Sequence, residues 1–310
     1  MKIYAIEEAY RNHPLPPQVE LVSFTNKRKL QRADIFFQNN IIEQKRKKFK
    51  PHYQYILDSK KPFIVVESSV FRKNMHQSPS KNAYHRFAWF SYFQDEGWYN
   101  NNNCPPDRWL EVKAMQQLEI KPWRKEGQYV LLVLQRPGDS SLKNLLKKYG
   151  SYEIFLKSVI KDIRKNTNKP IKIRLHPLRQ DVQLSIIEQL NLDGVTISDN
   201  NSPNKGSVLD GGDGLQKDFD NAFAVVGFNS NALTESVCEG IPTFSLCPSS
   251  MAWQCSNKDL KNLDTPKTFK RDQWLFNLAY CQWREDEIAR GLPIDHLLPL
   301  YNKAAKYVSR

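Results

Sequence analysis

The second half of the chain repeats one pattern, in which a short, mostly apolar run ends in a polar turn and is followed by a helical segment. The runs are 129–134, 171–175, 195–197, 223–226 and 243–246. Strands that are apolar along most of their length are typical of parallel sheets, which are covered on both faces and require a crossover segment between neighbours. The pattern therefore predicts an open α/β sheet whose ligands bind beyond the carboxyl ends of its strands.

The first half shows a weaker form of the same pattern. Its apolar runs are 1–6, 19–24, 33–37 and 63–66. A chain of 310 residues is longer than the roughly 250 residues at which a single core usually stops growing. We therefore expect two α/β domains, 1–125 and 126–310, which meet near the segment 121–127, and a helical tail in the second domain from about residue 271.

Charge is unevenly distributed between these two predicted domains. Residues 1–125 carry 22 Lys and Arg against 12 Asp and Glu, and residues 126–310 carry 24 against 21. The first domain thus holds +10 of a net charge of +13. A basic domain joined to a near-neutral one favours a polyanionic partner for the basic domain.

Cysteine usage and hydropathy exclude several classes of protein. Five cysteines without a CxxC pair or a His at zinc-finger spacing argue against a disulfide framework and a zinc site. They favour a reducing, cytoplasmic compartment, which would be the host cytoplasm if the protein is viral. No apolar run approaches the roughly 18 residues of a membrane helix, and the first residues do not read as a secretory signal. We predict no metal site and no obligate protein partner.

An aromatic and basic segment, 76–109, follows the last apolar run of the first domain. Aromatic rings interleaved with basic and amide groups suit a base-stacking or sugar-binding surface, and they also suit an irregular packed lid. The residues predicted to bind the acceptor are Arg72, Lys73, His85, Arg86, Trp98 and Arg108.

The most specific segment is 226–243, in which an apolar run leads to a polar turn, a helix, a glycine and another apolar run. Asn229, Ser230 and Asn231 would lie at the start of the helix, where free backbone N–H groups favour phosphate. Glu235, one turn further in, can accept hydrogen bonds from ribose hydroxyls. An ordinary capped strand–helix unit is the alternative interpretation of these residues.

This segment resembles the nucleotide-sugar site of the GT-B glycosyltransferases. The pair His176-Pro177, directly after the run 171–175, is similar to the His-Pro motif of polysialyltransferase-like and capsule glycosyltransferases. The resemblance covers roughly 128–250 and implies a GT-B-like fold, with two Rossmann-like domains facing a central cleft. In those families the His and a Ser contact donor phosphates, which implies these roles for His176 and Ser230. The turn here reads Asn-Ser-Asn where the family has Ser-Ser-Thr.

The turn after the first strand of the second domain fits the same site. A glycine at position 138 lets the backbone approach a diphosphate, and Arg136 and Arg179 can neutralise its charge, although a surface ion pair is the alternative for each arginine. The predicted donor-binding residues are Gln135, Arg136, Gly138, Ser141, His176, Arg179, Asn229, Ser230, Asn231 and Glu235. The expected co-substrate is a nucleotide sugar, with a UDP-sugar favoured, and no other cofactor is expected.

A general base is the remaining requirement of an inverting GT-B enzyme, and such enzymes usually take it from the first domain. It must deprotonate an acceptor hydroxyl as the anomeric carbon is attacked. We predict Glu67 and Asp95 as the catalytic residues, with Glu96, His76 and His85 as alternatives. An enzyme that retains configuration requires no such base.

Together these features predict a hexosyl- or pentosyltransferase that moves a sugar from a nucleotide sugar to a hydroxymethylated pyrimidine in phage DNA. Double-stranded DNA would then be the partner of the basic domain, and the target base would have to leave the stack. A capsule or lipopolysaccharide glycosyltransferase is the first alternative, since a basic surface also suits anionic polymers and headgroups. A non-enzymatic nucleic-acid-binding protein is the second.

Overall fold

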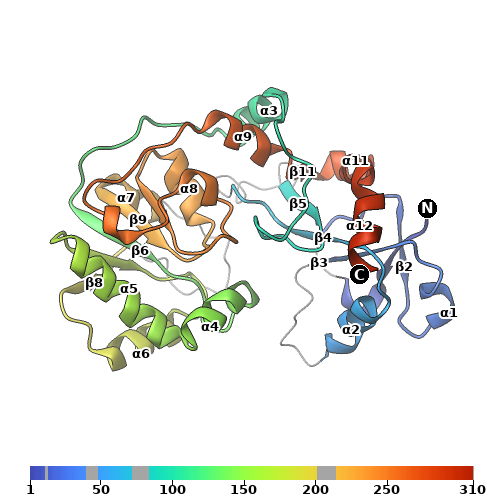
Figure 1. Ribbon diagram of the computed structural model, residues 1–310, viewed down its shortest axis with the longest axis horizontal. Helices are drawn as coiled ribbons and strands as arrows, with labels where there is room; N and C mark the ends of the chain where they lie inside the picture. The colour runs from blue at the N-terminus through green and yellow to red at the C-terminus, as the bar shows by residue number, and fades with distance from the viewer. Residues whose placement is uncertain (11–12, 40–47, 72–83, 201–213, 310) are drawn as a thin grey trace. The chain divides into compact units, whose positions relative to one another are not determined.

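The computed structural model describes residues 1–10, 13–39, 48–71, 84–200 and 214–309 (Figure 1). The chain divides into two units, of which unit 1 comprises Met1–Met115 with Leu275–Arg310 and unit 2 comprises Gln116–Trp274. This division differs from the expected domains 1–125 and 126–310 in two ways, since unit 2 begins at Gln116 and the C-terminal segment Leu275–Arg310 belongs to unit 1. Unit 1 then carries 24 Lys and Arg against 15 Asp and Glu, and unit 2 carries 22 against 18.

Unit 1 is built on a six-stranded sheet in the order β11-β5-β4-β3-β1-β2. The strands are β1 (Ile3–Ile6), β2 (Val19–Val22), β3 (Ile35–Asn39), β4 (Phe63–Ser68), β5 (Tyr84–Trp89) and β11 (Gln282–Arg284). The first four are the predicted apolar runs and pair in parallel, whereas β5 is antiparallel to β4 and β11 is antiparallel to β5. The sheet is therefore mixed, with its two antiparallel strands at one end.

Helices cover both faces of this sheet. The helices described in unit 1 are α1 (Lys27–Leu30), α2 (Lys50–Asp58), α3 (Asp107–Met115), α10 (Glu285–Ala289), α11 (Leu292–Leu297) and α12 (Tyr301–Val308). Residues of α1 and α2 share one apolar cluster with alternate strand residues such as Ile6 and Val65. Residues of α10, α11 and α12 share the other cluster with Ala5 and Ile64. The alternation of side chains along each strand thus fills two cores.

The aromatic segment 76–109 contains a central strand, which the prediction of a loop surface missed. Every residue of β5 is buried, and the Trp89 indole N–H donates to the carbonyl oxygen of Leu297 at 3.0 Å. Phe87 and Trp89 belong to one core cluster, and Tyr92 and Phe93 belong to the other. The aromatic residues described here are mainly core residues. The sequence pattern did not identify the strand, because a strand buried on both faces shows no alternation of apolar and polar residues.

Unit 2 is built on a five-stranded parallel sheet in the order β10-β9-β6-β7-β8. Its strands are β6 (Tyr129–Val133), β7 (Ile171–Arg174), β8 (Val195–Ile197), β9 (Ala222–Gly227) and β10 (Thr243–Ser245). All five were predicted, with small differences at their ends. The chain moves outward from β6 through β7 to β8 and then returns to the other side of β6 with β9, so the strand order reverses between β6 and β9.

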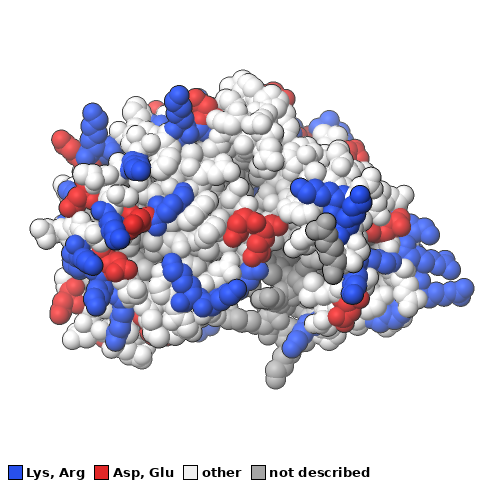
Figure 2. Space-filling view, viewed as in Figure 1, with Lys and Arg blue, Asp and Glu red and all other residues white. Residues whose placement is uncertain are grey.

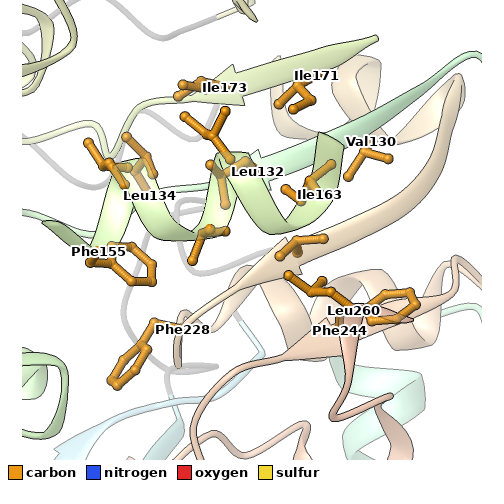
Figure 3. Packing of buried hydrophobic residues seen from close by; sticks show 14 of the residues in the cluster. Val130, Leu132, Leu134, Phe155, Ile163, Ile171, Ile173, Phe228, Phe244 and Leu260 are labelled. Atoms are coloured by element: carbon orange, nitrogen blue, oxygen red, sulfur yellow. The ribbon is translucent and has the colours of Figure 1, made fainter. Parts of the chain in front are cut away.

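The helices of unit 2 are α4 (Lys143–Tyr149), α5 (Tyr152–Asn166), α6 (Gln180–Leu190), α7 (Gly214–Asp220) and α8 (Ala232–Cys238), and α9 (Asp272–Ala279) begins in it. The hydroxyl of Ser151 caps α5 by accepting from the Ile154 N–H at 3.2 Å. Apolar residues at helical spacing, among them Phe155 and Ile163, face β6 and β7 and form the core (Figure 3). This packing holds the carboxyl ends of the strands in place.

Among the described residues, no helix has both the length and the apolar composition to cross a lipid bilayer.

Candidate functional site

The loops after β6 and β9 are joined by hydrogen bonds at the point where the strand order reverses. The Gln135 side chain accepts from the Asn229 backbone N–H at 3.2 Å and donates to the Ser141 hydroxyl at 3.1 Å. The Asn229 amide donates to the Ser141 carbonyl oxygen at 3.0 Å. The Tyr152 hydroxyl on α5 donates to the Gln135 carbonyl oxygen at 2.8 Å. Three of the predicted donor-binding residues therefore form one bonded junction.

This junction keeps an unused polar atom. The side-chain oxygen of Asn229 is buried and has no hydrogen-bond partner among the residues the structure describes. Buried acceptors are usually satisfied, so an exception needs an explanation. A hydroxyl or amide group of a ligand bound at the junction would satisfy it.

His176 follows β7, the neighbour of β6, and its tautomer is set by the backbone. The N–H of Leu178 donates to His176 Nδ1 at 3.1 Å, so Nδ1 is unprotonated and Nε2 carries the proton. The fully buried Gln183 holds the backbone, because its side chain accepts from the His176 N–H at 2.8 Å and donates to the His176 carbonyl oxygen at 3.0 Å. A neutral imidazole with a fixed N–H donor suits a phosphate oxygen. Gln183 lies seven residues beyond the motif, and sequence reasoning missed it.

The two predicted donor-site arginines both make ion pairs. Arg136 pairs with Asp139 at 2.7 Å, and Asp139 also accepts from the Ser141 N–H at 2.9 Å. Arg179 is exposed, with its Nε 3.7 Å from Asp181. Both arginines therefore make the surface ion pairs that were the alternative interpretation. Arg136 is connected to the junction through Asp139, which accepts from the Ser141 N–H. Gly138, between Arg136 and Asp139, has φ +78° and open space around its α-carbon.

The helix after β9 is short. The Ser230 hydroxyl accepts from the Ala232 N–H at 3.3 Å, and Asn231 has helical backbone angles without a side-chain cap. Glu235 lies in the first turn of α8, which has only seven residues. The summed dipole of so short a helix is small, so the loops contribute more to this site than the helix N-terminus does.

The loop after β10 joins the same end of the sheet, which sequence reasoning also missed. Ser245 donates to the Phe228 carbonyl oxygen at 3.3 Å, and the Asn144 amide on α4 donates to the Ser249 hydroxyl at 2.8 Å. The Ser-Ser pair at 249–250, shortly after an apolar run, was the available signal.

Two of the arginines predicted to bind the acceptor, Arg86 and Arg108, have partners within unit 1. Arg86 is 5 % exposed and donates to the Ser68 carbonyl oxygen at 2.8 Å and to the Tyr92 carbonyl oxygen at 3.3 Å. Arg108 donates to both carboxylate oxygens of Glu287, at 2.6 and 3.2 Å. Arg86 thus joins β5 to β4, and Arg108 joins α3 to α10, so both guanidinium groups are engaged within unit 1.

The other acceptor predictions divide into three cases. Trp98 is half-buried and packs edge-on against Phe90 and Tyr307, with ring centroids 5.1 Å apart in both pairs. His85 is buried at the start of β5, opposite Ser68. Arg72 and Lys73, together with the alternative base His76, lie outside the described residues.

The two predicted catalytic carboxylates lie on different segments of unit 1. Glu67 is half-buried at the carboxyl end of β4, where its side chain accepts from the Ser68 N–H at 2.8 Å. Asp95 is exposed and follows β5, which runs antiparallel, so it lies beyond the end of β5 that pairs with the start of β4. Glu96, beside it, accepts from the Ser91 hydroxyl at 3.1 Å. Glu67 was predicted from the end of the apolar run 63–66 and Asp95 from the aromatic segment, and β5 lies between them in the sequence.

The chain matches none of the family models compared with it, and none of the curated proteins. Among solved structures it is similar to Thermosulfurimonas dismutans KpsC, beta Kdo 2,4 transferase, with a TM-score of 0.56, 12 % sequence identity and 90 % of both chains covered. It is also similar to Thermosulfurimonas dismutans KpsC, beta Kdo 2,7 transferase, with a TM-score of 0.54, 13 % identity, and 96 % of this chain and 99 % of that chain covered.

At this level of identity the likeness establishes the fold. The predicted fold class, α/β of the GT-B type with one largely parallel sheet in each unit, is confirmed. Among the described residues, no three His, Cys, Asp or Glu side chains are grouped so as to hold a metal ion.

Proposed function

We propose that the protein is a nucleotide-sugar-dependent glycosyltransferase of the capsule or lipopolysaccharide type, with unit 2 binding the donor. The observation that carries the proposal is the bonded junction of Gln135, Ser141 and Asn229 at the switch point of the unit 2 sheet. Ligands of open α/β sheets bind at such points. A polar ligand bound at this junction would donate a hydrogen bond to the buried Asn229 side-chain oxygen, which has no partner among the described residues.

The proposed nucleotide-sugar site combines uncharged hydrogen-bond donors with a cation that an ion pair partly neutralises. The His176 N–H would donate to a phosphate oxygen, and Arg136 would approach the phosphates while bound to Asp139. Ser230 and Asn231 would add hydroxyl and amide contacts, and Glu235 would accept from sugar hydroxyls. This arrangement suits a nucleotide diphosphate or monophosphate sugar, and a UDP-sugar is the first donor to test.

The acceptor is proposed to be a carbohydrate and not a DNA base. The DNA interpretation depended on an exposed aromatic and basic surface. Arg86 and the aromatic residues of β5 are instead buried in unit 1, and Arg108 is half-buried and paired with Glu287. The two similar structures are described as beta Kdo transferases, so Kdo belongs among the sugars to be tested as donor and as acceptor.

A thermal-shift screen of UDP-, CDP-, GDP- and CMP-sugars tests the donor site. Wild-type protein should be stabilised by at least one class, and His176→Ala and Gln135→Ala should bind that donor ten- to a hundredfold more weakly, since each loses a hydrogen bond to a charged or buried group. Gln189→Ala, an exposed glutamine on α6, is the matched control. Full stabilisation in both site variants, or none in wild type, would contradict the proposal.

Mass analysis of acceptors tests the second half of the proposal. The stabilising donor is incubated with oligosaccharides and, separately, with duplex DNA that contains a hydroxymethylated pyrimidine. A sugar mass gained by an oligosaccharide supports the carbohydrate acceptor. A sugar mass gained only by the DNA would restore the DNA interpretation.

A further inference from the structure

Three aromatic rings from two distant segments of unit 1 meet at its surface. Phe90 and Trp98 follow β5, and Tyr307 lies in the last turn of α12. The ring centroids are 5.1 Å apart for Phe90 and Trp98, 5.0 Å for Phe90 and Tyr307, and 5.1 Å for Trp98 and Tyr307. Phe90 and Trp98 are half-buried, and Tyr307 is 58 % exposed. We call these three residues the aromatic cluster.

The backbone holds Phe90 in the aromatic cluster at a cost in strain. Phe90 has φ +67°, in the left-handed region that bulky residues rarely adopt. The Ser91 N–H donates to the Trp89 carbonyl oxygen at 2.8 Å, so Phe90 is the central residue of a γ-turn. Trp89 and Trp98 exchange two backbone hydrogen bonds, at 3.1 and 3.2 Å. Such strain persists only where the surrounding structure fixes it, so the aromatic cluster is a rigid feature of the surface.

Two lysines of α12 lie beside the aromatic cluster. The helix packs on the unit 1 sheet through the buried Ala304 (Figure 1). The Lys303 Nζ lies 4.7 Å from the centroid of the Trp98 ring, which is a cation–π contact. Lys306, directly before Tyr307, is exposed. In the part of the chain that the structure describes, neither lysine forms an ion pair.

The same end of the sheet exposes further apolar and basic side chains. Leu57, in the last turn of α2, is 44 % exposed, and Lys60 is exposed between α2 and β4. β4 begins at Phe63, whose carbonyl oxygen accepts from the Phe90 N–H at 3.0 Å. This is the amino end of the parallel strands, whereas the ligands of such sheets bind at the carboxyl ends. A substrate at the carboxyl ends of the unit 1 strands would therefore leave this surface free.

The geometry of the rings distinguishes between a sugar and a lipid surface as the partner. A sugar stacks on an open, flat ring face, but the Phe90 and Trp98 planes are inclined at 89° and the Trp98 and Tyr307 planes at 61°. Lys303 also lies over the Trp98 ring. The rings thus pack into one another as an apolar knob. Tyrosine and tryptophan, with an apolar body and a polar tip, are enriched where a membrane meets water, and lysines attract anionic headgroups.

We propose that this end of unit 1 binds the surface of an anionic lipid bilayer, with the aromatic cluster in the headgroup region and Lys303 and Lys306 beside anionic headgroups. The exposed carboxylates at this end, Asp58 and Asp95, oppose the attraction. Each lysine near such a surface strengthens binding about fivefold, and salt screens the attraction. Binding is therefore weak, reversible and dependent on salt. This inference does not depend on the glycosyltransferase function proposed above.

Vesicle sedimentation tests the proposal with the full chain. Vesicles of phosphatidylcholine with about one third phosphatidylglycerol, and vesicles of phosphatidylcholine alone, are titrated at low and at high salt. Wild type should sediment with the anionic vesicles at low salt, and binding should be about tenfold weaker at high salt or without the anionic lipid. Tyr307→Ser and Lys303→Ala should each weaken binding about fivefold, and Asp95→Asn should strengthen it by a similar factor.

Leu110→Ser and Lys113→Ala on α3 are the matched controls. Leu110 is 60 % exposed, much as Tyr307 is, and Lys113 is exposed. α3 is tied to the other end of the sheet, because Glu111 pairs with Arg284 of β11, beside the first residue of β5 and the carboxyl end of β4. Both control variants should bind vesicles as wild type does.

Three outcomes would overturn the proposal. The first is no binding of wild type to anionic vesicles at low salt, and the second is equal binding by wild type, Tyr307→Ser and Lys303→Ala. The third is an equal loss in the α3 variants, since a general attraction of a basic protein would then explain the binding. If a soluble anionic polysaccharide binds through Tyr307 and Lys303 and vesicles do not, the surface belongs to a saccharide instead. None of these results changes donor stabilisation in the thermal-shift screen, so a failure here is distinguishable from a failure of the glycosyltransferase function.

Discussion

Acidification should destabilise unit 1 through His85. The imidazole has a pKa of about 4 in the folded protein, against an ordinary value of 6.5, because burial disfavours its charged form. A group whose folded pKa is lowered contributes stability that is present above the unfolded value and is lost as pH falls toward the folded value. The affected window therefore runs from about pH 6.5 down to about pH 4.

The size of this effect follows from the same two values. A difference of about 2.5 pKa units corresponds to roughly 3 kcal/mol when the whole window has been crossed. At pH 5 the unfolded imidazole is almost fully protonated and the folded one is still mostly neutral. About 2 kcal/mol of the free energy of unfolding should then be lost relative to pH 7.5.

Urea denaturation of wild type and His85→Gln at pH 7.5 and pH 5 measures this quantity. Gln is of similar size and polar, but it does not titrate. The loss of unfolding free energy on acidification should be about 2 kcal/mol smaller in the variant, and hydrogen exchange of β4 and β5 amides assigns the transition to unit 1. His52→Gln serves as the matched histidine control. Equal losses in wild type and His85→Gln would refute the argument that burial keeps His85 neutral.

Three further predictions concern other parts of the chain. Arg108→Leu should cost about 3–5 kcal/mol of unfolding free energy in urea, because it leaves the buried Glu287 carboxylate, 4 % exposed, without its cation; Glu287→Gln in the same chain should recover part of that loss. Gly240→Ala should unfold unit 2 at a lower temperature than Gly138→Ala does. Both have positive φ, but a Cβ at Gly240 would lie 2.0 Å from a backbone carbonyl oxygen, and one at Gly138 would meet nothing within 4 Å. Brief acetylation at pH 7.5, followed by mass spectrometry, should modify Lys258 before other lysines, because burial lowers its pKa to about 8.

The strands of unit 2 could be predicted from the sequence almost completely. β6 and β9 lie inside a parallel sheet with both faces covered, and such strands must be apolar along their whole length. The polar residues directly after them, Gln135 and Asn229, could also be predicted, because ligands bind where these strands end. Local sequence carries both pieces of information.

The antiparallel strands of unit 1 could not be predicted in the same way. β5 reads Tyr-His-Arg-Phe-Ala-Trp, and its charge is compatible with a buried strand only because the Ser68 and Tyr92 carbonyl oxygens accept from Arg86. β11 has three residues and pairs with β5 from almost two hundred positions further along the chain. Partners so distant in sequence leave no local pattern. For the same reason the contact between His13 and His85, whose Nδ1 atoms are 3.0 Å apart, was missed.

Net charge and local charge lead to different conclusions about the partner of unit 1. Its excess of Lys and Arg includes the run Lys27, Arg28 and Lys29 in α1, and Figure 2 shows basic side chains gathered at that end of the unit. α1 follows β2, which lies at the opposite end of the sheet from β5 and β11. Among the described residues, the end near His85 carries the carboxylates Glu67 and Glu285, and its cations Arg86 and Arg284 have partners within the unit. Among the described residues, the basic run of α1 therefore lies far along the sheet from β5 and β11, and the net charge of unit 1 does not by itself identify a DNA-binding surface.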